Sequence, residues 1–242
     1  MDALEELAGL LTSGKMLSMG AEAAVYLTSF MGENFVVKYR FPKKYIHPLL
    51  AEELIVKRTK REARVLLNTR LNGLCVPRLF FTMLSKGILV MEKINGSRLD
   101  ELIGKVYPGE EQSTTFSRIY YNIGVVLGKL HSMNIIHGDF SVSNLMIKDE
   151  GLTELCIIDF GLSDFSNDPE DRAMDLRILF KSMESRFPRY LPSFRDKVIQ
   201  GYKAGITGFN FNSVIQRLRE MELRGRYVKE RRRKHKTSVH NI

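Results

Sequence analysis

The chain has 242 residues, of which 44% are hydrophobic, and a formal net charge of +9. These values are ordinary for a globular protein with one two-lobed domain or two small domains. No apolar run approaches the roughly 20 residues that a bilayer span needs, and the acidic N-terminus argues against a secretory or transit peptide. Cys75 and Cys156 are the only cysteines. We therefore expect no disulfide, a reducing intracellular environment and no membrane association.

The first third of the chain reads mostly as strands. Residues 15–30 and 34–41 have the composition of short strands, with turns at Gly20 and at residues 32–34. A charged helix is predicted over residues 49–71. Further strands are predicted at 78–84 and 87–92, and a short helix is expected to start at residues 95–97.

From about residue 115 the pattern becomes helical. An apolar stripe with helical spacing is formed by Phe116, Ile119, Tyr120, Ile123, Leu127 and Leu130. Two short strand and turn stretches follow, and then helices near 172–186, 191–204 and 210–223. The fold class is α+β with two lobes. We expect a strand-rich lobe at 1–93, a helical lobe at 94–223 and a basic tail at 224–242.

Two turns in the helical part end on carboxylate or amide side chains. His137, Gly138 and Asp139 are followed by four residues and Asn144, and Asp159 begins the sequence Asp-Phe-Gly. Asp and Asn often cap turns and helix starts, so each stretch alone is a weak signal. Together, and with Lys38 at the end of a predicted strand, they match the order of the protein kinase motifs. The sequence predicts a protein-kinase-like fold.

Phosphoryl transfer assigns a role to each of these residues. Lys38 would neutralise the phosphates of ATP, oriented by a glutamate of the long helix. Glu62 is the preferred partner, with Glu52 and Glu53 as alternatives. Asn144 and Asp159 offer the oxygen ligands that Mg²⁺ prefers. Asp139 would orient the attacking hydroxyl or water, or accept its proton.

A second set of residues is predicted to hold the nucleotide. The backbone of Glu92 and Ile94 lies where kinases bend between lobes and contact adenine. Val25, Val36 and Met146 would sandwich the ring, although these three also fit ordinary core positions. Gly20 and Glu22 belong to the counterpart of the glycine-rich loop.

The departures from the kinase pattern are informative. The sequence Gly20-Ala-Glu-Ala-Ala-Val25 retains one of the three expected glycines, and Gly138 replaces the usual arginine. Only about ten residues separate Gly161 from the next helix, without Ala-Pro-Glu. This minimal activation segment favours a phosphotransferase or ATPase that is not regulated through that loop and does not bind extended peptides.

Several longer stretches carry a more specific resemblance. They are GAEAAVY, VVKYRFPKKYIHP, KRTKREARVLL, IIHGDFSVSNLMI, IIDFGLSDFSNDPEDRAMDL and ELRGR. In this order, from Gly20 to Arg226, they resemble the PRPK-type, or bud-site-selection, atypical serine/threonine kinases, the small kinase subunit of the KEOPS (EKC) complex. The segment K-x-R-F-P-K-x-Y and the L-R-G-R near the end are not general kinase features.

The resemblance implies an ATPase that supports threonylcarbamoyladenosine modification of tRNA, with serine/threonine kinase activity also described in the family. It implies ATP and Mg²⁺ as cofactors and a location in cytoplasm and nucleus. The implied partners are tRNA, a threonylcarbamoyltransferase subunit of the Kae/TsaD type at the helical lobe, and a small PRPK-binding subunit at the strand lobe.

The basic tail has three interpretations. Residues 224–236 hold eight Lys or Arg and one Glu, so they carry +7, whereas residues 1–223 carry only +2. The tail would bind tRNA phosphates, or it is a nuclear localisation signal or a solvated terminus. The candidate tRNA contacts are Arg224, Arg226, Lys229, Arg231, Arg232 and Arg233.

Three other functions stay open from the sequence. The chain would be a free serine/threonine kinase with a nuclear or cytoplasmic protein substrate, a small-molecule phosphotransferase, or a pseudokinase scaffold. The segments near Lys38 argue against the second. The set Lys38, Asp139, Asn144 and Asp159 argues against the third, because a scaffold needs none of these side chains.

Overall fold

The structure is a computed structural model that describes residue 9 and residues 11–43, 47–105, 114–148 and 154–224. The chain forms two compact units, each discontinuous in sequence. Unit 1 comprises residues 1–106 and 143–164, and unit 2 comprises residues 107–142 and 165–242. The predicted lobe boundary at residue 93 follows the chain linearly and stays a prediction.

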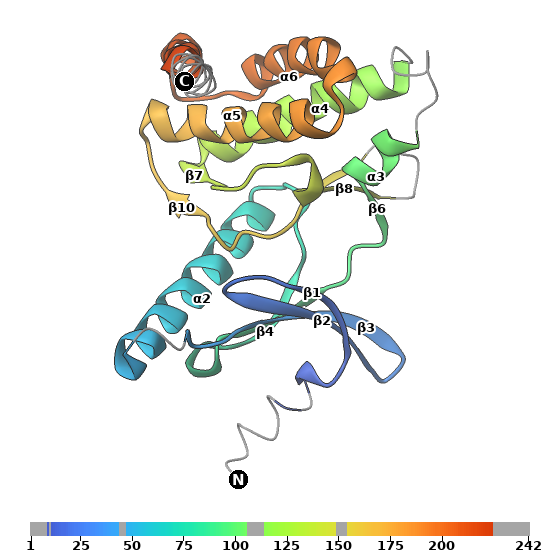
Figure 1. The fold of residues 1–242 in the computed structure, drawn as a ribbon, viewed down its shortest axis with the longest axis vertical. Helices are drawn as coiled ribbons and strands as arrows, with labels where there is room; N and C mark the ends of the chain where they lie inside the picture. Colours follow the sequence, from blue (N-terminus) through green and yellow to red (C-terminus); the bar gives the residue numbers. More distant parts are fainter. Residues whose placement is uncertain (1–8, 10, 44–46, 106–113, 149–153, 225–242) are drawn as a thin grey trace, which may run out of the picture. The chain divides into compact units, whose positions relative to one another are not determined.

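Unit 1 is built on a five-stranded sheet with the order β1-β2-β3-β5-β4, in which all neighbours are antiparallel. Figure 1 labels β1, β2, β3 and β4 of this sheet. Its strands are β1 (Lys15–Met19), β2 (Ala23–Phe30), β3 (Glu33–Arg40), β4 (Leu79–Met83) and β5 (Ile88–Glu92), with a 3-10 turn η1 (Leu84–Lys86) before β5. Strands β2 and β3 are joined by Met31 and Gly32, both with positive φ, the turn geometry that suits hairpin twist. Val37, Met83, Ile88 and Val90 form the core cluster of the sheet.

The long helix α2 (Pro48–Leu71) packs against β4, β5 and η1. Its bounds agree with the helix predicted at 49–71. Pro48 suits the first turn, where its missing N–H costs no hydrogen bond, and Gly73 ends the helix with a φ of 80°. The buried face includes one charged residue, Glu62, and this burial requires a partner inside the unit.

The rest of unit 1 is a three-stranded sheet, β6-β8-β9, with a short helix. Its elements are β6 (Gly96–Arg98), α3 (Leu99–Gly104), η3 (Val142–Asn144), which starts at the unit boundary, β8 (Leu145–Lys148) and β9 (Leu155–Ile157). The helix expected to start at 95–97 begins only at Leu99. Residues 96–98 pair instead with residues 146–148 of β8, which takes them into the sheet.

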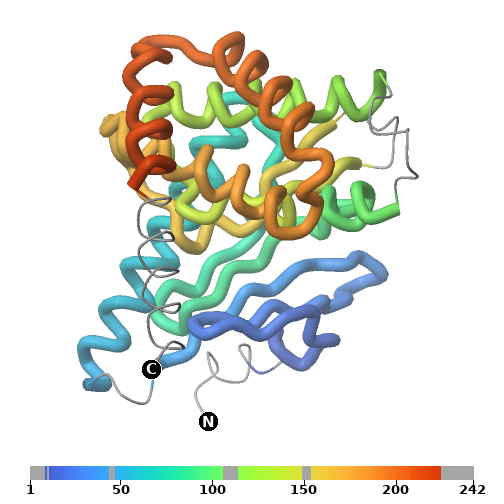
Figure 2. The backbone as a smooth tube through the Cα atoms, turned by 45° about the horizontal axis from the view of Figure 1, so that its top comes forward, coloured from blue at the N-terminus to red at the C-terminus, as the bar shows by residue number. Residues whose placement is uncertain are grey.

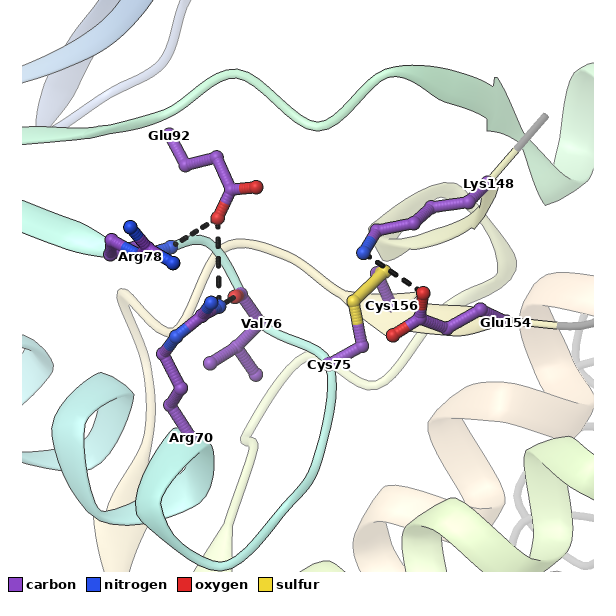
Figure 3. Close-up of a disulfide and its surroundings, with 8 residues drawn as sticks. All are labelled: Arg70, Cys75, Val76, Arg78, Glu92, Lys148, Glu154 and Cys156. Carbon is purple, nitrogen blue, oxygen red and sulfur yellow. Dashed lines mark hydrogen bonds and ion pairs between the residues drawn. A yellow bond between two sulfur atoms is a disulfide. The ribbon is translucent and has the colours of Figure 1, made fainter. Parts of the chain in front are cut away.

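A disulfide joins Cys75 to Cys156, and the expectation of no disulfide was wrong (Figure 3). After Gly73 the chain runs beside β9, where Cys75 forms a parallel bridge with Cys156. The carbonyl oxygen of Cys75 accepts a hydrogen bond from Ile157 N at 2.9 Å. The two Cα atoms are 4.5 Å apart although 81 residues separate them in sequence, and spacing alone gave no sign of this meeting.

Unit 2 is helical. It contains α4 (Thr114–Ser132), β7 (Ile135–Ile136), α5 (Pro169–Arg186), the 3-10 turn η4 (Pro188–Tyr190), α6 (Leu191–Gly205) and a helix at 211–224, while β10 (Asp164–Phe165) lies at the unit boundary. In Figure 2, α4 in green and α6 in orange are the principal helix pair of this unit. The predicted stripe on α4 is buried except for the half-buried Phe116.

Glycines let α4 and α6 approach closely. A Cβ added at Gly201 would lie 1.9 Å from Tyr121 O, and one at Gly124 would lie 2.0 Å from Val198 O. Backbone therefore meets backbone along this contact. Among the described residues, no helix combines the length and apolar character needed to cross a membrane.

Candidate nucleotide and phosphate site

Unit 1 contains a cavity of about 510 Å³. Nine of the predicted site residues line it: Val25, Val36, Lys38, Glu62, Glu92, Ile94, Asn144, Met146 and Asp159. The sequence did not single out the remaining lining residues: Leu17, Ser18, Leu66, Pro77, Met91, Lys93, Gly96, Arg98, Ser143 and Ile158. The volume is in the range of small-molecule sites, and an apolar end adjoins a charged end.

Lys38 lies at the charged end of the cavity. Strand β3 buries it, and its Nζ donates to Glu62 Oε1 at 2.9 Å and to Asp159 Oδ1 at 2.5 Å. Burial lowers the pKa of Lys38, but the two carboxylates outweigh burial and hold that pKa above its ordinary value. The ammonium is therefore charged at neutral pH. Glu52 and Glu53 are exposed on α2, so Glu62 is the glutamate that meets Lys38.

Asp159 follows β9 in a strained conformation. Its φ is 61°, in the left-handed region that non-glycine residues rarely adopt. Gly161 N donates to Asp159 Oδ1 at 3.1 Å, and a Cβ on Gly161 would lie 2.9 Å from Lys38 Nζ. A side chain at this position would therefore crowd the ion pair. The side chain of Asp159 is 52% exposed, so its carboxylate stays accessible for a ligand.

Asn144 stands beside Asp159 because its carbonyl oxygen accepts a hydrogen bond from Ile158 N at 2.9 Å. This bond joins the end of η3 to the residue before Asp159. Both side chains line the cavity that also contains Lys38. An amide and a half-exposed carboxylate on one cavity wall fit a magnesium ion, which prefers oxygen ligands and keeps several waters.

The apolar end of the cavity is formed by strands. Val25 of β2, Val36 of β3 and Met146 of β8 are half-buried rather than buried, so each keeps surface that faces the cavity. Glu92 N donates to Arg78 O at 2.8 Å, so this N–H is not the group of Glu92 that a ligand would bind. The contacts of these residues with adenine stay predictions.

Gly20 and Glu22 are not among the lining residues of this cavity. Gly20 N donates to Ala23 O at 2.8 Å, which closes the turn tightly. Glu22 lines a smaller cavity of about 50 Å³ and accepts hydrogen bonds from Lys43 Nζ at 2.8 Å and from Arg58 Nη1. These bonds lower the pKa of Glu22 to about 2. Its charge is therefore balanced by two cations, and its ATP contact stays a prediction.

Asp139 lies in unit 2, in a loop fixed by Asp175 of α5. The Asp175 carboxylate accepts hydrogen bonds from His137 N at 2.7 Å and Gly138 N at 2.9 Å. The Asp139 N–H in turn contacts His137 Nδ1 at 3.3 Å. His137 is fully buried, in keeping with a structural rather than an acid–base role. Sequence reasoning missed Asp175, although a lone aspartate inside the segment RAMDLRIL was a signal for it.

The same carboxylate also holds His131 of α4. His131 Nε2 lies 3.1 Å from Asp175 Oδ2, and its Nδ1 lies 2.7 Å from the Tyr202 hydroxyl. Full burial lowers the pKa of His131 despite the nearby carboxylate. A neutral imidazole therefore links α4, α5 and α6.

The predicted tRNA contacts fall mostly outside the described residues. Arg224 is exposed at the end of the helix at 211–224. The other five, Arg226, Lys229, Arg231, Arg232 and Arg233, fall outside the residues that the structure describes.

The chain is similar to known protein kinases, to EKC/KEOPS complex subunits and to tRNA threonylcarbamoyladenosine biosynthesis proteins. The family described as "Protein kinase domain" matches residues 13–184. The "EKC/KEOPS complex subunit bud32" of Dictyostelium discoideum is 35% identical over 213 residues, covering 88% of this chain and 83% of that protein. A "Probable bifunctional tRNA threonylcarbamoyladenosine biosynthesis protein" of Methanobrevibacter smithii is 34% identical over 213 residues. The match covers 88% of this chain and 37% of the longer bifunctional protein.

A solved structure supports the fold. The Rio2 kinase of Chaetomium thermophilum, crystallised as an ADP/Mg²⁺-phosphoaspartate complex, superposes with a TM-score of 0.55. The match covers 90% of this chain and 74% of that one at 14% sequence identity, which speaks for the fold alone.

Proposed function

Because this chain belongs to the protein kinase family and, within it, to the Bud32 subunits of the KEOPS complex, we propose that it turns over Mg-ATP to support threonylcarbamoyladenosine modification of tRNA. One observation carries the chemistry. Lys38, Glu62, Asp159 and Asn144 meet in a single cavity that is large enough for a small molecule.

We assign a separate role in ATP turnover to Lys38, to the pair Asn144 and Asp159, and to Asp139. Lys38 is kept protonated by Glu62 and Asp159, so it presents a fixed positive charge to the phosphates of ATP. Asn144 and Asp159 would hold Mg²⁺, which when bound supplies charge neutralisation at the transferring phosphoryl group. Asp139 would orient the attacking water or hydroxyl. The short segment after Gly161 leaves no platform for a peptide and favours water or a compact acceptor.

The partners follow from the family. A threonylcarbamoyltransferase subunit of the Kae/TsaD type and a small PRPK-binding subunit would assemble with the chain, and tRNA would be the nucleic acid partner. The names of the relatives support membership of such a complex. We place the protein in the cytoplasm and nucleus, where tRNA is made and used.

The deciding experiment is ATP hydrolysis by the purified chain with Mg²⁺, with and without tRNA and the transferase subunit. We expect turnover that rises with both partners and is abolished in Asp159→Ala and in Asp139→Ala. Asp164→Ala is the matched control, because Asp164 is an exposed aspartate paired with Arg61 and does not line the cavity. Turnover that ignores tRNA and the transferase, with phosphate appearing on protein, would instead indicate a free protein kinase.

A further inference from the structure

Arg40 belongs to the K-x-R-F-P-K-x-Y segment, and the proposed function gives it no role. It lies two residues after Lys38 on β3, and side chains two apart on a strand share a face. Arg40 is 4% exposed, an unusual position for an arginine. Its backbone is anchored as well, since Arg40 N donates to Gly87 O at 2.9 Å.

The guanidinium of Arg40 shares one carboxylate with Lys38. Lys38 Nζ binds Glu62 Oε1, and Arg40 Nη2 binds Glu62 Oε2. Each oxygen of Glu62 therefore has its own cation, and Glu62 is 2% exposed. Arg40 Nη2 would also lie 3.5 Å from a Cβ on Gly161, which places the guanidinium beside the Lys38 and Asp159 pair.

The charges of this cluster explain what the arginine adds. Lys38 alone faces two carboxylates, Glu62 and Asp159, and can be drawn toward either one. A planar guanidinium on the second oxygen of Glu62 fixes the orientation of that carboxylate, which a flexible ammonium does less well. With Arg40 the cluster has two cations and two carboxylates, so Glu62 keeps a cation when Lys38 is drawn toward Asp159.

We propose that Arg40 is a positioning residue that locks Glu62 and thereby keeps Lys38 aligned toward the phosphates of ATP. Arg40 lies on β3, so this positioning of Glu62 does not depend on a phosphorylated activation loop. The segment after Gly161 is too short to form such a loop. This inference rests on the proposed function, because it assigns a task in the same ATP site.

The test compares Arg40→Lys and Arg40→Met with the wild type in steady-state ATP hydrolysis. The ammonium of Lys38 stays in the cavity, so ground-state attraction of ATP is largely kept while alignment in the transition state is lost. We expect kcat to fall about tenfold, the size of one lost charge-assisted hydrogen bond, with KM changed less than about threefold. Methylguanidinium added to Arg40→Ala should recover part of the lost kcat.

A double variant separates positioning from general destabilisation. If Arg40 acts through Glu62, then Arg40→Lys combined with Glu62→Gln should have a kcat within about twofold of Glu62→Gln alone. Arg195→Lys is the matched control. It disrupts an arginine fork on Glu222, at 2.8 and 3.0 Å, in unit 2, and should keep both kcat and KM.

The outcomes are distinct. A wild type that neither binds nor hydrolyses ATP would overturn the proposed function and this inference with it. An active wild type whose Arg40 variants keep full kcat, or whose double variant shows additive losses, would overturn the role of Arg40 and leave the proposed function standing.

Discussion

Two clusters of buried charged residues among the described residues show how partners of opposite charge and hydrogen bonds accompany burial. Lys38 and Arg40 each bind one oxygen of Glu62 in unit 1, and Asp175 is enclosed by backbone N–H groups and His131 in unit 2. An unpaired charge in either place would cost several kcal/mol. Some residues proposed to act on ATP, such as Lys38 and Glu62, therefore also contribute to the stability of the fold.

His131 gives the protein a pH-dependent stability. Burial depresses its pKa in the folded state below the ordinary 6.5, so the unfolded chain binds the proton more readily. Its contribution to stability is therefore complete above pH 6.5 and is lost as the pH falls below that value. We expect the free energy of unfolding to drop by at most about 1.4 kcal/mol per pH unit from this group.

The measurement is urea unfolding between pH 7.5 and 5 for the wild type and His131→Gln. Subtracting the free energy of unfolding of His131→Gln from that of the wild type at each pH removes the titrations that both proteins share. This difference in free energy should shrink as the pH falls. A free-energy difference that is constant across this pH range would show that the pKa of His131 is not changed by folding. The charged or titratable groups that face His131 are Asp175, Arg172 and His137, together with the Tyr202 hydroxyl on Nδ1.

At the same scale, the sequence predicted residues that belong to ordered motifs and missed those that only the fold brings together. Lys38, Asn144 and Asp159 could be singled out because kinases keep such residues at characteristic spacings; the structure places all three on one cavity, and their catalytic and metal-binding roles stay predictions. Glu62 was preferred among three glutamates, and the structure places it on Lys38. Arg40 and Asp175 were missed because their importance comes from a buried partner distant in sequence, and one sequence carries no record of such contacts.

At the scale of elements, long periodic segments were predictable and short ones were not. The helix at 49–71 and the apolar stripe of α4 agree with the structure. The start of α3 was wrong, because sheet pairing overrode a local turn signal at Gly96. The cysteine pair could not be predicted, since it depends on how the chain leaves α2 relative to β9.

The disulfide makes the stability of unit 1 depend on redox conditions. It closes a loop of 81 residues, for which the chain-entropy model gives roughly 4 to 5 kcal/mol of stabilisation. We expect dithiothreitol to lower the free energy of unfolding of the wild type by up to about that amount. Equilibrium urea unfolding with and without reductant measures it.

The control for this prediction is the double variant Cys75→Ser with Cys156→Ala, which has no bond to reduce and should not respond to dithiothreitol. Ala suits the fully buried Cys156, and Ser suits the half-buried Cys75. Equal stability of the wild type in both conditions would show that the bond adds nothing to the folded state, or that it does not form.

At the scale of the whole molecule, charge is divided unequally. Residues 224–236 carry +7, and the part of the chain before them is close to neutral. If the tail binds tRNA phosphates, truncation after Leu223 should weaken tRNA binding and make its dependence on salt concentration shallower, because fewer counterions are released. ATP hydrolysis without tRNA should not change.

Filter binding of tRNA across a salt series, with the full chain and the truncated chain in parallel, measures both affinity and slope. If the full and the truncated chain show the same dependence of tRNA affinity on salt concentration, the tail does not contact tRNA. That result would favour the interpretation of the tail as a nuclear localisation signal. A uniform loss of ATP turnover in the truncated chain would show instead that the cut damages unit 2.

The discontinuity of unit 1 sets the order in which a newly made chain can acquire its site. The unit needs residues 143–164, which leave the ribosome after residue 106 and all of α4. At translation rates of roughly 5 to 20 residues per second, the first 106 residues wait about 3 to 12 seconds for β8, β9 and Asp159. During that interval Cys75 has no Cys156 to pair with and Lys38 has only one of its two carboxylates. At that stage the five strands of the first sheet have been synthesised, but Asn144, Met146 and Asp159, which line the cavity, have not.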